Sequence, residues 1–571
     1  MNILQAVRSY ISKMCEESGP GMKLLLMDKD TTSIVSMAYS QSEILQKEVF
    51  LFERIDVASN QEHMKHLKCI VFVRPSSENI AYLAKELQEP KYGVYYLYFS
   101  NILSKADLKK LAESDVMESV REVQEFYADY IPLSPFLYSL NIKGATEGLQ
   151  WRSYNLLRSA QGITSLLLSL KRNPFIRFQA NSDLSRRLAD KVREILSKES
   201  ALFEFRNETD SATILLILDR REDAVTPLLL QWTYQAMVHE LLTITNNRVS
   251  LANVPGVSDE LKEVVLSAEN DEFYAQAQYN NFGETGQKIK NLMEEFQKKA
   301  KSTQRVESIS DMKTFVEAYP QFKKMSGTVA KHVTVVGELS SKVGKHQLME
   351  VSVAEQEITC RNDHAQHLNS VKQLIANSSI RDEDALRLVM LYALKYEKHS
   401  NNALVNLMEA LKKRGIEEQK CKLVYNLLEF GGQHARQCDL FGTQMDVTDV
   451  NNVKNIVTRK LKGLKGVDNV FTQHNPLLKD TLEDLIKGRL RDTLFPYLGS
   501  STMRKAQDVV VFIVGGVTYE ESCLVNQMNK ELSGARIILG GTTMLNSAAF
   551  MDEVQIATQG IPNRRTRSKF R

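Results

Sequence analysis

Short apolar runs alternate with stretches of helical spacing over the first 128 residues. The runs "MKLLLMD", "EVFLFERI", "CIVFVRP" and "VYYLYFS" lie near residues 22, 48, 69 and 93, and stretches such as "SSENIAYLAKELQEP" separate them. This alternation predicts strand–helix–strand units in a parallel sheet. The runs are almost continuously apolar, which predicts that helices cover both faces of the sheet. We therefore expect a first α/β domain over residues 1–128.

The same pattern returns in two separated places, at "ATILLILD" (212–219) and at "DVVVFIVGG" (508–516) followed by "ARIILGG" (535–541). Between them, residues 227–474 carry mostly helical patterns such as "DALRLVMLYALKYEKH". The pattern alone leaves two arrangements open: a helical region inserted into a second α/β domain, or three domains in series. Residues 293–313 are charged with few apolar positions, which predicts the exposed limb of a helical hairpin.

The junction "LILDRREDAVTPLLLQWTYQAM" (216–237) joins a predicted strand to a predicted helix. Thr226 is placed to cap the helix, and Pro227 suits its first position because the missing N–H costs nothing there. Asp219 and Asp223 have the ligand chemistry for Mg²⁺, yet carboxylates in such a turn more often bond backbone N–H groups. We favour a structural turn.

A nucleotide-binding or phosphohydrolase enzyme built on Asp219, Asp223 and the Gly515-Gly516 turn is the alternative function. A glycine turn before a helix can bind an anion, but the GxxxxGK[ST] and GxGxxG spacings are absent. We expect these glycines to serve close packing of strand against helix, and "GGVTYEE" to open its helix with a capping box from Thr518 to Glu521. His364 and His367 lack a third ligand and are expected to face solvent. No catalytic constellation is complete, so we expect neither an enzyme nor a cofactor or metal.

Composition limits the partners. The 571 residues are 43% hydrophobic and 25% charged, as in a folded multidomain protein. The net charge is +3, and five basic residues lie in the tail 560–571, so the body lacks the excess of Lys and Arg that nucleic-acid binding needs. Six scattered cysteines suit reduced thiols of the cytosol. No signal peptide and no apolar run of membrane-spanning length are found, so any membrane role is expected to be peripheral or to act through a partner.

Several long segments together resemble the SM (Sec/Munc) family, whose members bind syntaxins and promote SNARE assembly in vesicle fusion. They are "LLILDRREDAVTPLLLQWTYQAMVHELL", "YPQFKKMSGTVAKHVTVVGELS", "FTQHNPLLKDTLEDLIKGRL" and "VFIVGGVTYEE" followed by "IILGGTT". The resemblance runs from near residue 5 to near residue 555. The segments "GPGMKLLLMDKDTTSIVSM" and "VLSAENDEFYA" are similar to the branch that serves the trans-Golgi network and endosomes.

The resemblance implies an α/β and α fold, a three-domain arch with two parallel-sheet domains and a large helical domain inserted into the second. The implied boundaries are 1–128 for domain 1, 129–226 for the first part of domain 2, 227–474 for domain 3 and 475–571 for the rest of domain 2 with its basic tail. It also implies a cytoplasmic monomer, peripheral on Golgi, trans-Golgi and endosomal membranes. Its expected partners are a syntaxin-type SNARE and the assembled SNARE complex, without nucleic acid.

The resemblance implies two binding modes. A short N-terminal syntaxin peptide is expected in an apolar pocket on the outer face of domain 1, with Glu125 at its rim. Its expected lining is Leu103, Leu108, Leu111, Val120 and Val123. The alternative is that these residues pack the core of the domain itself.

The second mode places the SNARE bundle in a cleft between domains 1 and 3, where Asp28 and Glu53 match acidic positions of the family. Ser40 replaces a lysine that some members use nearby, so the sequence does not support clamping of a closed syntaxin. Pro320 matches a proline that interrupts a helix of the family's hairpin, and it is expected to act as a hinge because proline inside a helix costs about 3 kcal/mol. Its alternative role is a plain helix terminator.

Overall fold

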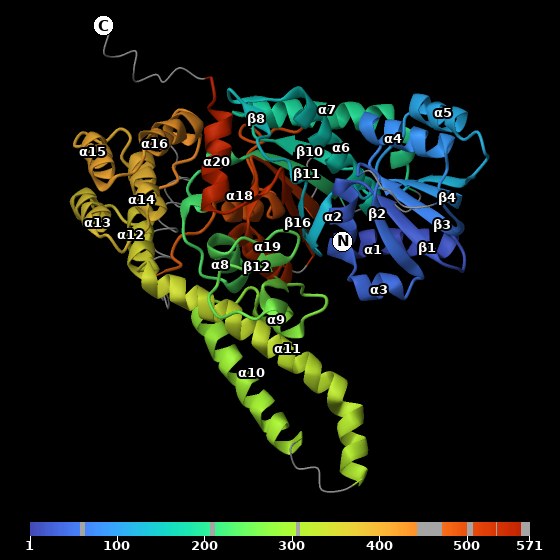
Figure 1. The fold of residues 1–571 in the computed structure, drawn as a ribbon. Helices are drawn as coiled ribbons and strands as arrows, with labels where there is room; N and C mark the ends of the chain where they lie inside the picture. The colour runs from blue at the N-terminus through green and yellow to red at the C-terminus, as the bar shows by residue number, and fades with distance from the viewer. Residues whose placement is uncertain are drawn as a thin grey trace. The chain divides into compact units, whose positions relative to one another are not determined.

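The computed structural model describes residues 1–57, 63–205, 212–303, 309–441, 471–499, 506–532 and 534–560, with side chains given outside 300–321 (Figure 1). The chain divides into two compact units. Unit 1 comprises Met1–Arg220, Leu478–Val517 and Leu524–Met544, and unit 2 comprises Arg221–Leu477, Thr518–Cys523 and Leu545–Arg571. The finer three-domain boundaries stay a prediction.

The first sheet of unit 1 has the strand order β2-β1-β3-β4-β5, and all of its strand pairs are parallel. Its strands are β1 (Lys23–Met27), β2 (Val49–Arg54), β3 (Met64–Val73), β4 (Tyr92–Phe99) and β5 (Val120–Glu125). Four of them confirm the predicted strands, whereas β5 was not predicted because "VREVQE" carries only two apolar residues. Helices accompany these strands, namely α1 (Ile3–Glu17), α2 (Lys29–Ala38), α3 (Gln41–Leu45), α4 (Ser77–Gln88) and α5 (Lys105–Ser114).

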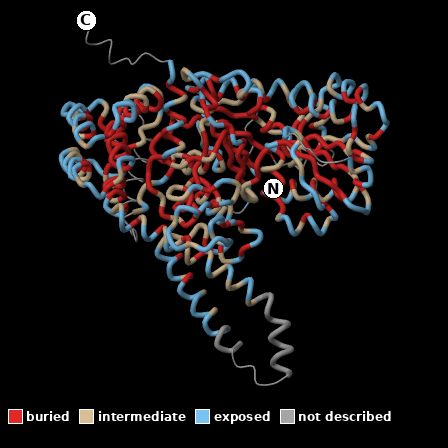
Figure 2. The backbone as a smooth tube through the Cα atoms, viewed as in Figure 1, coloured by how far each residue is buried: buried red, intermediate tan, exposed pale blue. Residues whose placement is uncertain are grey.

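The strands β1, β3 and β4 are largely buried, as their continuous apolar runs predicted (Figure 2). The prediction is wrong for the edge strand β2, where Phe50, Leu51 and Phe52 are 50%, 36% and 37% exposed. Leu25 and Phe72 belong to one hydrophobic core, whereas Leu24 and Val71 belong to a second core on the opposite face. Successive residues of a strand point to opposite faces, so an unbroken apolar run supplies both cores. The first core continues into the second sheet of unit 1.

The second sheet is assembled from strands that lie far apart in the sequence, in the order β10-β11-β14-β16-β7-β6. They are β6 (Ile131–Ser134), β7 (Leu137–Ser139), β10 (Phe175–Phe178), β11 (Ala212–Asp219), β14 (Ala506–Val514) and β16 (Arg536–Gly541). Because β11 pairs in parallel with β14, the helical region between them is an insertion into this α/β sheet. This resolves the alternative that the apolar pattern left open and agrees with the arrangement that the resemblance implied. The helices here are α6 (Ser153–Leu170) and α7 (Asp183–Lys198).

Unit 2 is mostly helical. Its helices are α8 (Tyr234–Leu241), α9 (Glu272–Ala277), α10 (Phe282–Thr303), α11 (Ile309–Lys345), α12 (Leu348–Cys360), α13 (His364–Ala376), α14 (Asp382–Lys395), α15 (Leu404–Arg414), α16 (Glu418–Gly431) and α20 (Ser547–Ala557). A small antiparallel ribbon pairs β12 (Arg248–Ser250) with β13 (Glu263–Val265). Helices α10 and α11 form a hairpin that projects from the rest of this unit (Figure 1). None of the helices in the described ranges is both long and apolar enough to cross a membrane.

The prediction that a helix begins at Pro227 is wrong. Thr226–Leu228 forms a short 3₁₀ turn, and α8 begins only at Tyr234. The segment between them is extended because its groups bond to α12: the Leu230 N–H donates to Glu355 Oε2 at 2.8 Å, and the Trp232 Nε1–H donates to Ser352 Oγ at 2.8 Å. These tertiary hydrogen bonds replace those that a helix would supply.

Candidate functional site

The loop before α5 is fixed to the end of β5 by Glu125. Its carboxylate accepts a hydrogen bond from the Leu103 N–H at 2.7 Å and another from the Tyr127 hydroxyl at 2.7 Å. Ser104 then caps α5, because its Oγ accepts from the Asp107 N–H at 3.0 Å. The predicted rim residue therefore orients the start of α5, the helix that carries Leu108.

The predicted apolar residues divide by exposure. Leu108 is 43% exposed and Val123 is 41% exposed, so both present apolar surface to solvent. Leu103 and Val120 are partly buried against the second core of the first sheet. Leu111 is only 3% exposed and belongs to that core, so it supports the surface from beneath.

The turn between α5 and β5 adds two residues that the sequence analysis did not single out. Val116 is 71% exposed and Met117 is 67% exposed. Two adjacent apolar residues in the otherwise polar "AESDVMES" would have revealed them, because a turn rarely exposes large apolar side chains without a partner. We group them with Leu108 and Val123 under the name α5–β5 apolar surface.

Asp28 is buried within unit 1. Its carboxylate caps α2 by accepting from the Thr31 N–H at 2.7 Å, and it also accepts from the Arg74 N–H at 2.6 Å and the Asn79 side-chain amide at 2.6 Å. Burial raises the pKa of Asp28, and the hydrogen bonds from Thr31 and Arg74 oppose that rise. The side chain joins the β1–α2 turn to the β3–α4 turn, so it is not presented to solvent.

Glu53 and Ser40 occupy different surroundings from Asp28. Glu53 lies in the edge strand β2, is half-buried, and accepts a hydrogen bond from the Tyr92 hydroxyl at 3.0 Å. Ser40 caps α3 in a capping box with Glu43. The role of Asp28 and Glu53 in a SNARE cleft stays a prediction.

Pro320 lies inside α11, which continues to Lys345. The alternative that this proline terminates its helix is therefore wrong. Its side chain lies outside those described, and its role as a hinge stays a prediction.

The two carboxylates of the enzyme alternative are engaged in local structure. In unit 1, Asp219 Oδ2 accepts from the Ser182 hydroxyl at 2.6 Å. In unit 2, Asp223 Oδ1 accepts from the Thr226 N–H at 3.0 Å, and its Oδ2 accepts from the Leu477 N–H at 3.2 Å. Such bonds are typical of turn-forming aspartates, which favours the structural interpretation.

The glycines of this region are required by close packing. Gly515 has φ +94°, and a Cβ there would lie 2.8 Å from Arg220 Cβ. A Cβ on Gly540 would lie 2.2 Å from the Tyr138 ring on the neighbouring strand β7. The packing partners of these two positions are thus the first residue of a short 3₁₀ helix, Arg220–Glu222, and a strand, where packing of strand against helix was expected. The predicted capping box is confirmed, since Thr518 and Glu521 exchange hydrogen bonds of 2.9 Å and 3.2 Å.

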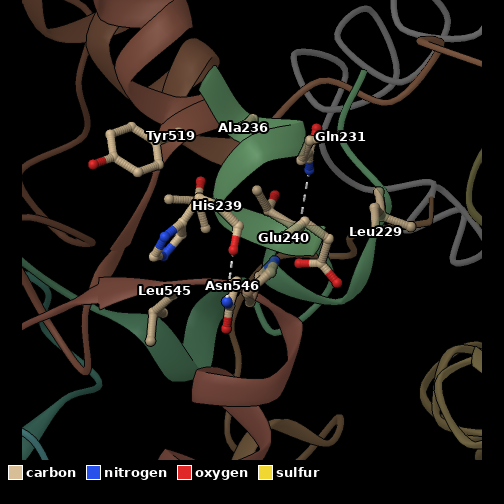
Figure 3. A pocket seen from close by; sticks show the side chains of 11 residues that line it. Leu229, Gln231, Ala236, His239, Glu240, Tyr519, Leu545 and Asn546 are labelled. Carbon is tan, nitrogen blue, oxygen red and sulfur yellow. Dashed lines mark hydrogen bonds between the residues drawn. The ribbon is translucent and has the colours of Figure 1, made fainter. Parts of the chain in front are cut away.

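A small crevice, open to solvent, lies between α8 and the start of α20 in unit 2 (Figure 3). Asn546 donates to the backbone carbonyl of His239 at 2.9 Å, and Glu240 accepts from the Ser547 N–H at 2.9 Å. These polar groups join the two helices to each other. Within the described ranges, no group of three or more His, Cys, Asp or Glu side chains is arranged to hold a metal ion.

The prediction that His364 and His367 face solvent is wrong for His367, which is 1% exposed. Its Nδ1 lies 2.7 Å from the Tyr396 hydroxyl, and His364 Nε2 lies 2.7 Å from the Tyr392 hydroxyl. Packing of α13 on α14 buries His367, whereas His364 is half-buried.

The sequence profile of the Sec1 family matches residues 23–553. The chain belongs to the Sec1 family. Vacuolar protein sorting-associated protein 45 of Mus musculus is 58% identical over 556 residues, covering 97% of this chain and 96% of the relative. The protein of that name from Saccharomyces cerevisiae is 34% identical over 583 residues, covering 98% and 100%.

A solved structure described as the SM protein Vps45 in complex with the Qa SNARE Tlg2 has a TM-score of 0.91 and 45% sequence identity, covering 99% of this chain and 100% of that one. This Sec1-family chain therefore matches its relatives along nearly their whole length. The predicted fold class, parallel-sheet α/β regions with a large helical region inserted, is confirmed.

Proposed function

We propose that this Sec1-family protein regulates SNARE-mediated vesicle fusion by binding a Qa-type SNARE, a syntaxin, and promoting assembly of the SNARE complex. The observation that carries the proposal is the near full-length similarity to a Vps45 that was solved with the Qa SNARE Tlg2, at 45% identity and a TM-score of 0.91. The function is binding without catalysis: holding helices in register lowers the entropy cost of assembly. We further propose that it acts at trans-Golgi and endosomal membranes, which it reaches through its partners.

The first contact is proposed to be the α5–β5 apolar surface, which takes the N-terminal peptide of the syntaxin. Burying a whole leucine side chain contributes about 1.5–3 kcal/mol. Leu108 is 43% exposed, so covering its exposed part contributes roughly 1 kcal/mol to the free energy of binding. Leu108, Val123, Val116 and Met117 together offer several such contributions, from which the cost of ordering the peptide is subtracted.

The second contact is proposed to be the helical hairpin α10–α11, along which SNARE helices align. The described residues 290–299 of α10 are exposed or half-buried, so this arm presents surface that another helix can contact. We assign three further residues to this second contact: the carboxylates Asp28 and Glu53, and the hinge at Pro320. The buried state of Asp28 favours a structural contribution there over a direct charge contact.

A peptide titration tests the proposal. The purified protein is titrated against a fluorescent N-terminal peptide of a trans-Golgi or endosomal syntaxin, with Leu108→Arg beside it. Arginine would bury a hydrated charge against apolar side chains, so we expect the affinity to fall at least about tenfold. Val405→Arg is the matched control, because Val405 is a 65% exposed apolar residue on α15 of unit 2.

The expected result is saturable binding by the wild type and by Val405→Arg, and its loss in a folded Leu108→Arg. Equal binding by all three proteins would show that the peptide binds to another surface. Absence of binding by the folded wild type, to the peptide and to the whole cytosolic part of the syntaxin, would refute the proposed function.

A further inference from the structure

Burial in the hairpin changes abruptly at two positions. Along α10, Thr285 and Ile289 are buried, whereas none of the described side chains at 290–299 is. Along α11, none of the described side chains at 322–331 is buried, and the buried stripe begins at His332 and continues with Val335, Leu339 and Val343 (Figure 2). The hairpin therefore leaves the body of unit 2 at Ile289 on one helix and at His332 on the other.

His332 connects α11 to two other helices. Its Nε2 lies 2.9 Å from Asp271 Oδ2, and its Nδ1 lies 2.8 Å from the Tyr234 hydroxyl in α8. Asp271 is the N-cap of α9, since its Oδ1 accepts from the Tyr274 N–H at 3.0 Å. The preceding residue, Lys331, contacts the same Asp271 oxygen and donates to the Val265 carbonyl at 3.2 Å. We call Tyr234, Asp271 and His332 the hairpin clamp.

With a neutral His332 ring, the clamp has one consistent arrangement of protons. The carboxylate of Asp271 can only accept, so His332 donates through Nε2–H, and the Tyr234 hydroxyl then donates to the bare Nδ1. Burial lowers the pKa of His332, which favours the neutral ring that this chain of bonds requires. All three side chains are buried, so water cannot replace a missing partner at no cost.

Directional bonds at this position have a mechanical consequence. Apolar contacts such as those of Val335 and Leu339 are non-directional and tolerate a helix that slides or rotates. A hydrogen bond weakens steeply as its angle departs from linearity. His332 is the first buried residue among the described side chains of α11, so a bonded chain there fixes the angle at which the projecting arm leaves unit 2.

We propose that Tyr234, Asp271 and His332 are positioning residues that hold the base of the hairpin in one orientation, so that its projecting arms meet SNARE helices already aligned. The inference rests on the proposed function for what the hairpin contacts. A second contact fits this role: Phe296 of α10 and Phe322 of α11 stack with ring centroids 5.2 Å apart, which joins the two arms beyond the clamp. An arm held at its base and tied to its neighbour moves as one body.

The test uses Tyr234→Phe, which removes one hydroxyl and keeps the ring. Its matched control is Tyr396→Phe, which removes the equivalent bond to His367 Nδ1, at 2.7 Å, within α13 and α14 of the same unit. Asp271→Asn is a second clamp variant that keeps an oxygen for the α9 cap and loses the charge. Three quantities are measured on the full chain: amide hydrogen exchange along α11, the rate of SNARE assembly, and the affinity for the syntaxin N-terminal peptide.

We expect both clamp variants to raise exchange at residues 322–345 about fivefold and to slow SNARE assembly, while peptide affinity stays unchanged. The control is expected to leave α11 exchange and assembly at wild-type values. The inference is overturned if the control changes α11 as much as the clamp variants do, or if assembly keeps its rate while exchange rises. If wild type neither binds the syntaxin nor speeds assembly, the proposed function fails, and the exchange comparison still decides whether the clamp holds the hairpin.

Discussion

Replacing Arg387 by Met measures how far unit 2 depends on one buried cation. The guanidinium is fully buried, with Nη2 at 2.6 Å from Asp384 Oδ1 and 3.1 Å from Glu355 Oε1. Its Nη1 lies 3.6 Å from Glu240 Oε1 and donates to the Leu228 carbonyl at 3.0 Å. Met fills a similar volume but leaves three carboxylates without their shared cation. Removing one partner of a buried ion pair costs about 3–5 kcal/mol, which corresponds to a Tm lowered by about 6–10 °C in a unit of this size.

The assay follows tryptophan fluorescence during heating. The chain has two tryptophans, Trp151 in unit 1 and Trp232 in unit 2, so a Trp151→Phe background reports unit 2 alone. Arg248→Met is the control, because Arg248 forms an ion pair with Glu263 in which the side chains are 56% and 57% exposed. Such a pair contributes less than about 1 kcal/mol. If Arg387→Met moves the transition no further than Arg248→Met, the reasoning about a buried, uncompensated cluster is refuted.

Three further predictions concern pH and glycine. Burial raises the pKa of Glu355 from its ordinary value to about 7. The group therefore contributes stability that is fully present below the pKa of the unfolded chain and is lost as pH rises through about 7. The Tm of the wild type is expected to fall between about pH 5 and pH 8, and the Tm of Glu355→Gln to fall less over the same range. Equal falls in the two proteins would contradict the assignment of this pH dependence to Glu355. Gly540→Ala would press a Cβ to 2.2 Å from the Tyr138 ring and should destabilise unit 1 by about 1–3 kcal/mol in denaturant unfolding. Gly337→Ala, exposed inside α11 with no atom within 4 Å, should instead stabilise by about 0.5–1 kcal/mol, and a loss of stability would show a contact there.

The site residues were predicted unevenly. Leu108 and Val123 are exposed apolar residues, as a peptide-binding surface needs, whereas Leu111 lies in the core although its spacing from Leu108 suits the same helix face. Helical spacing gives the face a residue lies on, but not how far the neighbouring elements cover that face. Asp28 shows the same limit, since its burial depends on Arg74 and Asn79, which reach it from the β3–α4 turn.

His332 shows most clearly which features local sequence patterns reveal and which they do not. Its place in the stripe with Val335, Leu339 and Val343 is visible as helical spacing, and nothing in that spacing names Asp271 or Tyr234 as its partners.

The sequence by itself determined where most strands lie, that the sheets are mainly parallel with buried central strands, and, through several long segments, the family. Local apolar periodicity and continuous motifs carry that information. Only the tertiary structure decided that β11 pairs with β14 across the helical insertion, that α8 begins at Tyr234, and which charged or polar side chains are buried. Those outcomes depend on hydrogen bonds and packing between residues far apart in the chain, and no local pattern records them.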